Sequence, residues 1–270
     1  MTTEPFGRSL SYSPIAERYD ARYQIPADLL LACFQRLRTQ GVLPAQGVLL
    51  DAGCGTGQMS LPLAELGYEV RGYDISAEMI RVARSKVRAG LRATYNAADV
   101  RSLPEPDSAV DGIVACKLFV HISDWRNAVV ELLRVLRPGA CLVLLNDAIA
   151  LENSVRFFFG QRADEAGYTD RFVGLHPARQ SELTAFLVES GCMEVSVDSG
   201  DQKWSRKLTF GTILDQFRER LFAEFWLMPA SDYDAILAQT SQWVDTLPQG
   251  RDTVDAISAQ LYVQVFRKGS

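Results

Sequence analysis

Short apolar runs alternate with amphipathic stretches through the first half of the chain. Five runs have the length and apolar content of buried strands: residues 48–53, 68–74, 93–99, 110–119 and 140–147. Three stretches between them repeat apolar residues three and four positions apart, as amphipathic helices do: residues 59–66, 76–89 and 127–137. Strands and helices that alternate at this spacing predict a parallel, doubly wound sheet with right-handed crossovers.

Both ends of the chain add elements to this core. Residues 11–40 have helical periodicity, and Pro26 divides them into two helices. The second half predicts three more helices, over residues 181–190, 208–226 and 231–247, and two more strands, over residues 193–199 and 257–268. The predicted fold class is therefore α/β: a doubly wound, mostly parallel, seven-stranded sheet with a helical cap inserted before the last strand.

The same pattern predicts two parts in the chain. Residues 1–147 hold the N-terminal helices and a ligand-binding core. Residues 148–270 complete the core sheet and carry the helical insertion, over residues 205–257, which we expect to shape the substrate site. Ligands of doubly wound sheets bind beyond the carboxyl ends of the strands, so the residues that follow the predicted strands are the candidates for ligand contact.

The composition is that of a globular protein. The 270 residues are 47% hydrophobic, which is enough for a core, and the net charge of -5 disfavours a nucleic-acid partner, which needs a concentrated cationic face. The N-terminus has no apolar signal region, and no apolar run approaches the roughly 18 residues that span a bilayer. We therefore expect a cytoplasmic protein without membrane association.

The cysteines favour the same compartment. Their number is odd, no two form a C-x-x-C pair, and several lie in apolar runs: Cys33, Cys54, Cys116, Cys141 and Cys192. This pattern argues for a reducing environment and against a disulfide framework or a zinc site, so we expect no bound metal.

The segment from Asp51 to Gly57 is the most informative in the chain. Its sequence, DAGCGTG, places glycines at 53, 55 and 57 directly after the first predicted strand. Glycines there let the backbone turn sharply and approach a ligand, because no Cβ is in the way. Asp51 lies two residues before the first glycine. A carboxylate near the loop would repel a pyrophosphate and would suit a ligand that carries an ammonium and a sulfonium group.

Two further acids end the next two strands. Asp74 ends the second, where a carboxylate can accept hydrogen bonds from both ribose hydroxyls. Asp99 ends the third, where it could accept a hydrogen bond from an adenine amino group. Each aspartate alone is also explained as a turn former or helix cap. Three acids at three successive strand ends, beside a glycine loop, together describe an adenosine ligand without phosphates.

Long segments around these residues resemble the class I S-adenosylmethionine-dependent methyltransferases. VLLDAGCGTGQMS resembles their motif I, and GYEVRGYDISAEMIRVAR is similar to the segment that holds the ribose. The likeness covers about residues 45–147 and is greatest to the small-molecule branch called type 11. Glu105, Val110 and Ala140 depart from that branch, at positions without an expected ligand contact. The resemblance implies a Rossmann-like fold, S-adenosyl-L-methionine as cofactor and S-adenosyl-L-homocysteine as product.

The resemblance also implies which residues contact the cofactor. The methionine portion is expected at Asp51, Gly53, Gly55 and Gly57, and the ribose at Asp74. The other expected contacts are Ile75, Met79, Asp99 and Val100 around the adenine and Lys117, mainly through its backbone, near the methionine end. YSPIAERYDARY resembles the N-terminal helix that closes over the cofactor in relatives. Tyr12 and Tyr19 are thus candidate lid residues, although aromatic core packing explains either as well.

His121 is the candidate catalytic residue. It lies just beyond the fourth predicted strand, where the resemblance places the transferring methyl group. An acceptor hydroxyl needs a base to remove its proton, whereas a neutral amine attacks unaided. Asn146 and Asp147, at the end of the fifth strand, are candidates to orient His121 or to bind substrate, and His176 has the context of a surface residue. The alternative for His121 is a loop histidine with no catalytic part.

The expected partner is a small-molecule acceptor, with a hydroxyl favoured slightly over an amine. Aromatic residues concentrate after residue 155, where we expect most to form core and some, first those within 156–162, to line an apolar acceptor pocket. The alternatives are a C-methyltransferase, another S-adenosylmethionine-using enzyme, or a non-catalytic module that binds this cofactor. The glycine spacing and Asp51 disfavour a nicotinamide oxidoreductase. A monomer and a homodimer are both open.

Overall fold

The chain divides into two compact units. The computed structural model describes residues 9–22, 24–150 and 154–270. The first unit holds the described residues up to Asn146 together with Val173–Gln202 and Leu261–Ser270. The second holds the described residues of Asp147–Phe172 and Lys203–Gln260. The first break, after Asn146, lies one residue before the boundary expected from the sequence.

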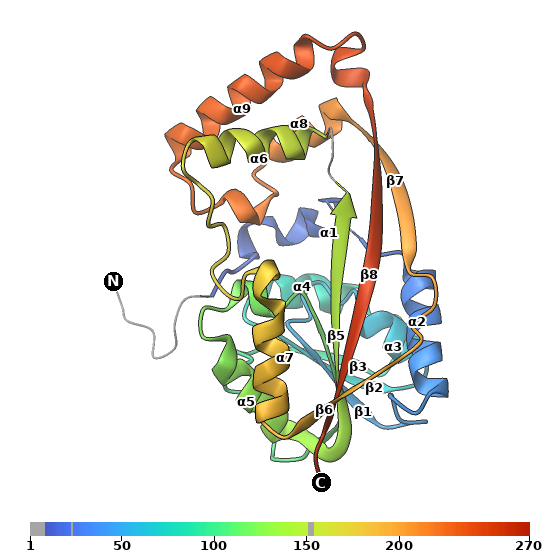
Figure 1. Cartoon of the computed structure of the whole chain (residues 1–270). Helices are drawn as coiled ribbons and strands as arrows, with labels where there is room; N and C mark the ends of the chain where they lie inside the picture. Colours follow the sequence, from blue (N-terminus) through green and yellow to red (C-terminus); the bar gives the residue numbers. More distant parts are fainter. Residues whose placement is uncertain (1–8, 23, 151–153) are drawn as a thin grey trace. The chain divides into compact units, whose positions relative to one another are not determined.

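Over the described ranges the strands form an eight-stranded sheet, and Figure 1 shows how its strands are arranged. They are β1 (Val48–Ala52), β2 (Glu69–Asp74), β3 (Ala93–Ala97), β4 (Val110–Cys116), β5 (Leu136–Ala150), β6 (Cys192–Val195), β7 (Lys203–Thr209) and β8 (Val254–Lys268). The main path has the order β3-β2-β1-β4-β5-β8-β6, and β7 pairs with β8 beside it. Strands β1 to β5 pair in parallel, whereas β6 and β7 run antiparallel to β8. The predicted α/β, Rossmann-like class is confirmed, with β7 as an additional strand.

The chain order along the sheet reverses between β1 and β4. From β1 the chain proceeds outward to β2 and β3, then returns to β4 and proceeds through β5 on the other side. Such a switch point opens a crevice at the carboxyl ends of the two central strands, and ligands of doubly wound sheets bind there. The glycine loop follows β1 and the His121 loop follows β4, so both predicted segments lie at this switch point.

The helices of the first unit supply the rest of its core. They are α1 (Tyr19–Arg22), α2 (Ala27–Thr39), α3 (Ser60–Glu65), α4 (Ala77–Ser85), α5 (Trp125–Val135) and α7 (Gln180–Glu189), with 3-10 turns at Ser13–Arg18, Phe119–His121 and Pro177–Arg179. Pro26 precedes α2, as predicted. Helices α5 and α7 contribute Leu132 and Leu187 to a buried cluster with strand residues such as Ile113 and Leu144. Within the described ranges, no helix has the length and apolar content needed to cross a membrane.

Strands β3 and β4 end earlier than the sequence predicts at the carboxyl edge of the parallel strands, and β1 and β6 also end early, at Ala52 and Val195. β4 ends at Cys116, three residues short, because Lys117 has a φ of 50°, in the left-handed region that a strand residue does not adopt. β3 ends at Ala97, so Asp99 lies in the loop after the strand. Both differences put side chains expected on strands into loops beside the sheet.

The second unit has its own aromatic core. It contains α6 (Val155–Glu165), α8 (Phe210–Arg218), α9 (Ala230–Asp245), 3-10 turns at Ala223–Phe225 and Gly250–Asp252, strand β7 and the first half of β8. Phe159 is fully buried, with ring centroids 4.2 Å from Phe217 and 5.1 Å from Tyr233. Phe157, two residues earlier in the same helix, is exposed. The stretch predicted to line an acceptor pocket thus contributes at least one ring to this core.

Gly174 packs directly against the loop that follows β4. Its N–H donates to the Val120 carbonyl at 3.0 Å, and the Leu175 N–H donates to the Phe119 carbonyl at 2.8 Å. A Cβ at Gly174 would overlap the carbonyl oxygen of Phe119 and lie 2.7 Å from the Ile122 nitrogen. The backbone at Gly174 therefore packs on the backbone of the loop that holds His121, with no space for a side chain between them. This close contact fixes the position of that loop.

We expect Gly174→Ala to lower the free energy of unfolding by about 1 to 3 kcal/mol, because the added methyl group forces two backbone segments apart. Urea unfolding followed by circular dichroism measures this. Gly160→Ala is the control: the site is inside α6, and the new Cβ would have its nearest contact at 3.5 Å. That change should be neutral or stabilising, since alanine is the better helix former. Equal stability of Gly174→Ala and the unmodified protein would contradict the close approach.

Candidate functional site

The glycine loop joins β1 to α3 and uses its own N–H groups to fold. Gly53, Gly55 and Gly57 have φ angles of 69°, 51° and 86°, which glycine adopts without strain. The N–H groups of Gly53 and Cys54 donate to the Tyr73 carbonyl at 2.8 and 2.9 Å, and the Gly57 N–H donates to the Cys54 carbonyl at 2.9 Å. The loop is therefore tied to the end of β2 by backbone hydrogen bonds.

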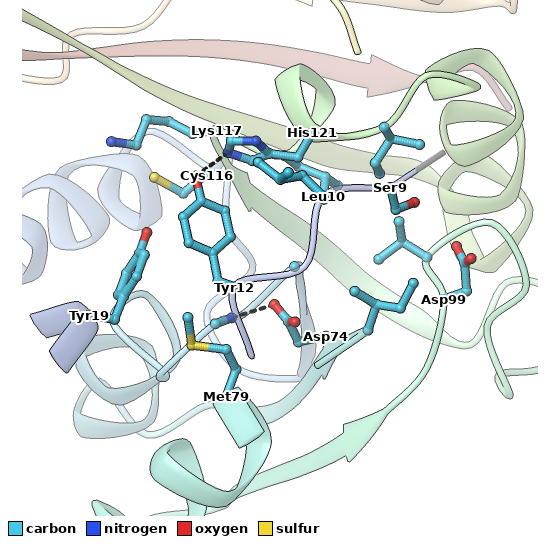
Figure 2. Close-up of a pocket in the computed structure, with 16 residues that line it drawn as sticks. Ser9, Leu10, Tyr12, Tyr19, Asp74, Met79, Asp99, Cys116, Lys117 and His121 are labelled. Atoms are coloured by element: carbon cyan, nitrogen blue, oxygen red, sulfur yellow. Dashed lines mark hydrogen bonds between the residues drawn. The ribbon is translucent and has the colours of Figure 1, made fainter. Parts of the chain in front are cut away.

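Asp74 ties the same two segments through its side chain. Its Oδ2 accepts a hydrogen bond from the Gly55 N–H at 2.9 Å (Figure 2), and its Oδ1 accepts one from the Ser76 N–H at 2.9 Å. The Ser76 hydroxyl caps α4 by accepting from the Met79 N–H at 3.1 Å. Burial raises the pKa of Asp74, and the bonds from Ser76 and Gly55 oppose this. Each carboxylate oxygen has lone pairs for further donors.

Asp51 is buried in β1. Its Oδ2 accepts a hydrogen bond from the Ser60 hydroxyl, while its Oδ1 is buried without a partner among the described residues. Burial raises the pKa of Asp51 to about 7; the Ser60 hydroxyl lowers it, and the nearby charge of Asp74 raises it further. Gly57 lies close to the Tyr95 ring: a Cβ added at Gly57 would lie 2.7 Å from the phenol oxygen of Tyr95.

The segment before the first helix crosses to the loop that follows β4. Ser9 forms an isolated antiparallel bridge with Ile122, and the Leu10 N–H donates to the His121 carbonyl at 2.9 Å. The Tyr12 hydroxyl lies 3.2 Å from His121 Nε2, within hydrogen-bonding distance (Figure 2). The two rings meet edge to face, with centroids 5.1 Å apart. Backbone and side-chain contacts therefore fix the imidazole from the N-terminal side.

A polar cluster anchors α1 to the glycine loop. Asp20 accepts a hydrogen bond from the Thr56 hydroxyl at 2.6 Å and forms an ion pair with Lys86. The Lys86 ammonium also donates to the Thr56 carbonyl at 2.9 Å. Tyr19, the neighbour of Asp20, packs edge to face on Tyr12 at 5.4 Å. The N-terminal segment is thus attached at the His121 loop and at the glycine loop, on two sides of one pocket.

This pocket encloses about 680 Å³ of space, its open mouth included. It lies entirely in the first unit. Most of the predicted site residues line it: Tyr19, Gly53, Gly55, Asp74, Ile75, Met79, Asp99, Val100, Lys117 and His121. Asp51 and Gly57 do not line it, so their expected contacts with the methionine portion stay predictions. Figure 2 shows Tyr12 between His121 and Met79, and Asp99 at the opposite side of the pocket from Tyr19.

Several lining residues were not predicted as contacts. They are Ser9, Leu10, Cys116, Leu118 and Ile122, together with the candidate lid residue Tyr12. Leu118 and Ile122 flank His121 in sequence, so their place at the strand end was available as a signal. Ser9 and Leu10 carry no such signal, because they reach the pocket only through pairing with a segment more than 100 residues away.

The remaining candidates lie elsewhere. Neither Asn146 nor Asp147 is among the lining residues, since β5 continues past them to Ala150. His176 caps a 3-10 turn, with Nδ1 accepting from the Ala178 N–H at 3.1 Å. The cysteines are free thiols, and the described ranges hold no group of three or more His, Cys, Asp or Glu placed to bind a metal ion.

The fold and the site define a class of protein: a Rossmann-like domain with a pocket at its switch point. Residues 49–139 match a family described as "Methyltransferase domain". The solved structure of the YcgJ protein from Bacillus subtilis has the same fold, with a TM-score of 0.57 and 21% identity over 88% of this chain and 99% of that one. The family match over residues 49–139 supports a class I S-adenosylmethionine-dependent methyltransferase.

Two relatives match part of the chain in sequence. A demethylmenaquinone methyltransferase from Thermus thermophilus is 37% identical over 141 residues, half of this chain and 63% of that protein. An O-methyltransferase, cnsE, from Penicillium expansum is 41% identical over 107 residues, 37% of this chain and 38% of that protein. The chain thus covers less than two thirds of either relative.

We expect Asp51→Asn to stabilise the ligand-free protein more at pH 8 than at pH 5. The folded pKa of about 7 lies above the ordinary 3.8, so folding favours the protonated carboxyl; that contribution is complete below about pH 4 and is lost as the pH rises through 7. Asparagine is neutral throughout. Its advantage should grow by about 2 to 3 kcal/mol between the two pH values, at 1.36 kcal/mol per pKa unit. Urea unfolding at both pH values measures it.

Asp99→Asn is the matched control. Hydrogen bonds and charge from Arg101 hold the pKa of Asp99 below its usual range, against the effect of burial. Asp99 is therefore ionised at both pH values, and its replacement should cost the same at pH 5 as at pH 8. An advantage of Asp51→Asn that does not change with pH would show that Asp51 is not protonated in the folded protein.

Proposed function

We propose that this protein transfers a methyl group from S-adenosylmethionine to a small-molecule acceptor. This proposal rests on the hydrogen-bond acceptors that the N–H groups of the glycine loop bind. In dinucleotide-binding loops such groups face a pyrophosphate. Here those of Gly53, Cys54, Gly55 and Gly57 all donate to acceptors of the protein itself. A phosphate would meet the Asp74 carboxylate instead of these donors, so the arrangement favours a nucleoside without phosphates.

The residues present fit the adenosine end of this cofactor. Asp74 keeps acceptor capacity on both oxygens for the two ribose hydroxyls. Met79, Ile75 and Val100 provide apolar surface for the adenine, and Asp99 offers an acceptor beside them. When bound, the cofactor supplies a sulfonium methyl group that is open to in-line attack. The protein's task is then to align an acceptor and exclude water.

The proposed role of His121 is to hold the proton of an acceptor hydroxyl. It lines the pocket, and its Nε2 is hydrogen-bonded to Tyr12. A base needs a fixed ring and a neutral nitrogen facing the substrate, and the bond from one ring nitrogen determines the state of the other. Tyr12 thus fixes the ring. An amine acceptor would need only orientation and water exclusion from the same residues.

The proposal extends to the setting of the enzyme. We assign it to a cytoplasmic, reducing compartment, because its cysteines are free thiols and four of the five are buried. The helical insertion over residues 205–257 and the stretch 156–162 remain the candidates for shaping the acceptor site, with an oxygen acceptor ahead of nitrogen. A C-methyltransferase, or a module that binds the cofactor without chemistry, would use the same adenosine contacts and is separated from this proposal only by an activity assay.

The first test is isothermal titration of the protein with S-adenosylmethionine and S-adenosylhomocysteine, with NAD as the comparison ligand. We expect micromolar binding of the first two, and NAD at least about 100-fold weaker, because the carboxylates repel its pyrophosphate. Asp74→Ala should weaken S-adenosylhomocysteine binding by about 1.5 to 3 kcal/mol, the usual value of hydrogen bonds to a charged group. Tighter binding of NAD than of either sulfur ligand would refute the proposal.

Once an acceptor is identified, His121→Phe should lower kcat by about 10² to 10⁴ if the acceptor is a hydroxyl, because the group proposed to take its proton is removed. The Kd for S-adenosylhomocysteine should change by less than about threefold. Tyr12→Phe is the matched variant: it keeps the ring and removes the hydroxyl bonded to Nε2. Its kcat should fall by a smaller factor and its pH profile should shift, since the imidazole loses a partner. Unchanged kcat in His121→Phe would exclude a base role.

A further inference from the structure

The Asp99 carboxylate is held by a buried guanidinium two residues along the chain. Arg101 Nε donates to both carboxylate oxygens, at 2.9 Å to Oδ1 and 3.2 Å to Oδ2, and Nη2 donates to Oδ2 at 2.6 Å. The Arg101 backbone N–H adds a fourth bond to Oδ1 at 2.9 Å. The Arg101 side chain is 0% exposed, while that of Asp99 is 24% exposed and lines the pocket.

This burial makes the pair different from a surface salt bridge. An exposed ion pair contributes little, because water competes for both charges. A fully buried guanidinium has lost its hydration, so its N–H donors need acceptors within the protein. Because the guanidinium is planar and binds both oxygens of the carboxylate, it also fixes the plane of the carboxylate. Asp99 therefore presents its remaining lone pairs in one orientation, whereas an ungripped carboxylate rotates.

The charge state of Asp99 is fixed as well. Burial alone would raise the pKa of its carboxyl, but the hydrogen bonds and charge of Arg101 reverse this and hold the pKa below its usual range. The ionised carboxylate has acceptors and no donor at any pH near neutrality. A ligand edge at this side of the pocket is favoured if it carries an N–H donor and disfavoured if it carries a carbonyl oxygen.

We propose that Arg101 positions the Asp99 carboxylate as a fixed hydrogen-bond acceptor that selects an amino-purine over an oxo-purine. The inference rests on the proposed function, since it takes an adenosine ligand to occupy the pocket. Arg101 is a positioning residue: its side chain has no exposed surface in the pocket and acts through Asp99. The exocyclic amino group of adenine donates to the carboxylate, whereas the carbonyl oxygen of hypoxanthine faces it as a second acceptor.

The test compares the Kd values of S-adenosylhomocysteine and S-inosylhomocysteine. Their bases differ at two neighbouring positions: adenine has an amino group on C6 and a bare N1, and hypoxanthine has an oxo group on C6 and an N1–H. The unmodified protein should prefer the adenine ligand by at least about tenfold, the effect of one hydrogen bond to a charged group. Arg101→Met removes the grip at similar length and should reduce the preference to less than about threefold. Asp99→Asn should abolish or reverse it, because an amide can donate to the oxo group.

Two further variants keep the test decisive. Arg101→Lys retains a charge but cannot grip both oxygens at once, so it should give an intermediate preference if Arg101→Met does not fold. Arg134→Met is the control, because Arg134 donates to the Leu103 carbonyl and pairs with Asp107 in the same loop without contacting Asp99. Its preference should equal that of the unmodified protein. Adding Arg101→Met to Asp99→Asn should change the preference no further.

The outcomes separate this inference from the proposed function. If the unmodified protein binds neither ligand, the proposed function fails. If it binds and prefers adenine, but folded Arg101→Met and Arg101→Lys keep the full preference, the positioning role of Arg101 is wrong. A preference that Asp99→Asn leaves intact would show that another group reads the base. If Arg134→Met loses the preference for the adenine ligand as fully as Arg101→Met does, the loss reflects a general loosening of the loop after β3 and the positioning role of Arg101 is wrong.

Discussion

The hydrogen bond from the Gly55 N–H to the Asp74 carboxylate joins the two segments on which the pocket depends. It holds the glycine loop over the end of β2, beside the two backbone bonds to the Tyr73 carbonyl. The same carboxylate accepts from Ser76, which caps α4 and so sets where Met79 begins to face the pocket. One side chain thus fixes the loop and the helix start, while its remaining lone pairs stay available to a ligand.

The N-terminal segment closes the pocket by contacts with the same framework. Asp20 and Lys86 attach α1 to Thr56 in the glycine loop, and Leu10 and Tyr12 attach the preceding residues to His121. The catalytic candidate and the cofactor loop are therefore coupled through one short stretch of chain. Apolar packing adds to these polar contacts, because Ala16 is buried in a cluster with Met79 and Val82 against which Tyr12 and Tyr19 pack.

The sequence predicted the parts whose chemistry is local. The glycine loop, Asp74 and the alternation of strands and helices follow from spacing over ten or twenty residues, so periodicity and residue type were enough. Contacts between distant segments were out of reach: Tyr12 meets His121 across 109 positions, and nothing in Ser9 or Leu10 predicts a bridge to the β4 loop. The burial of a side chain could not be predicted either. The sequence DAGCGTG does not reveal that Asp51 is buried and does not line the pocket.

The three aspartates differ in how readily each carboxyl ionises, because different groups surround them. Asp99 is matched by a guanidinium, whereas the groups that shift the pKa values of Asp51 and Asp74 are a hydroxyl, backbone amides and, for Asp51, the other carboxylate. Asp99 is thus neutralised within the protein and can only orient a ligand. Asp51 and Asp74 hold charge that burial and mutual repulsion disfavour. A ligand that brings positive charge relieves that repulsion and one that brings phosphate increases it, so the electrostatics of the site independently favour a sulfonium-bearing amino acid over a dinucleotide.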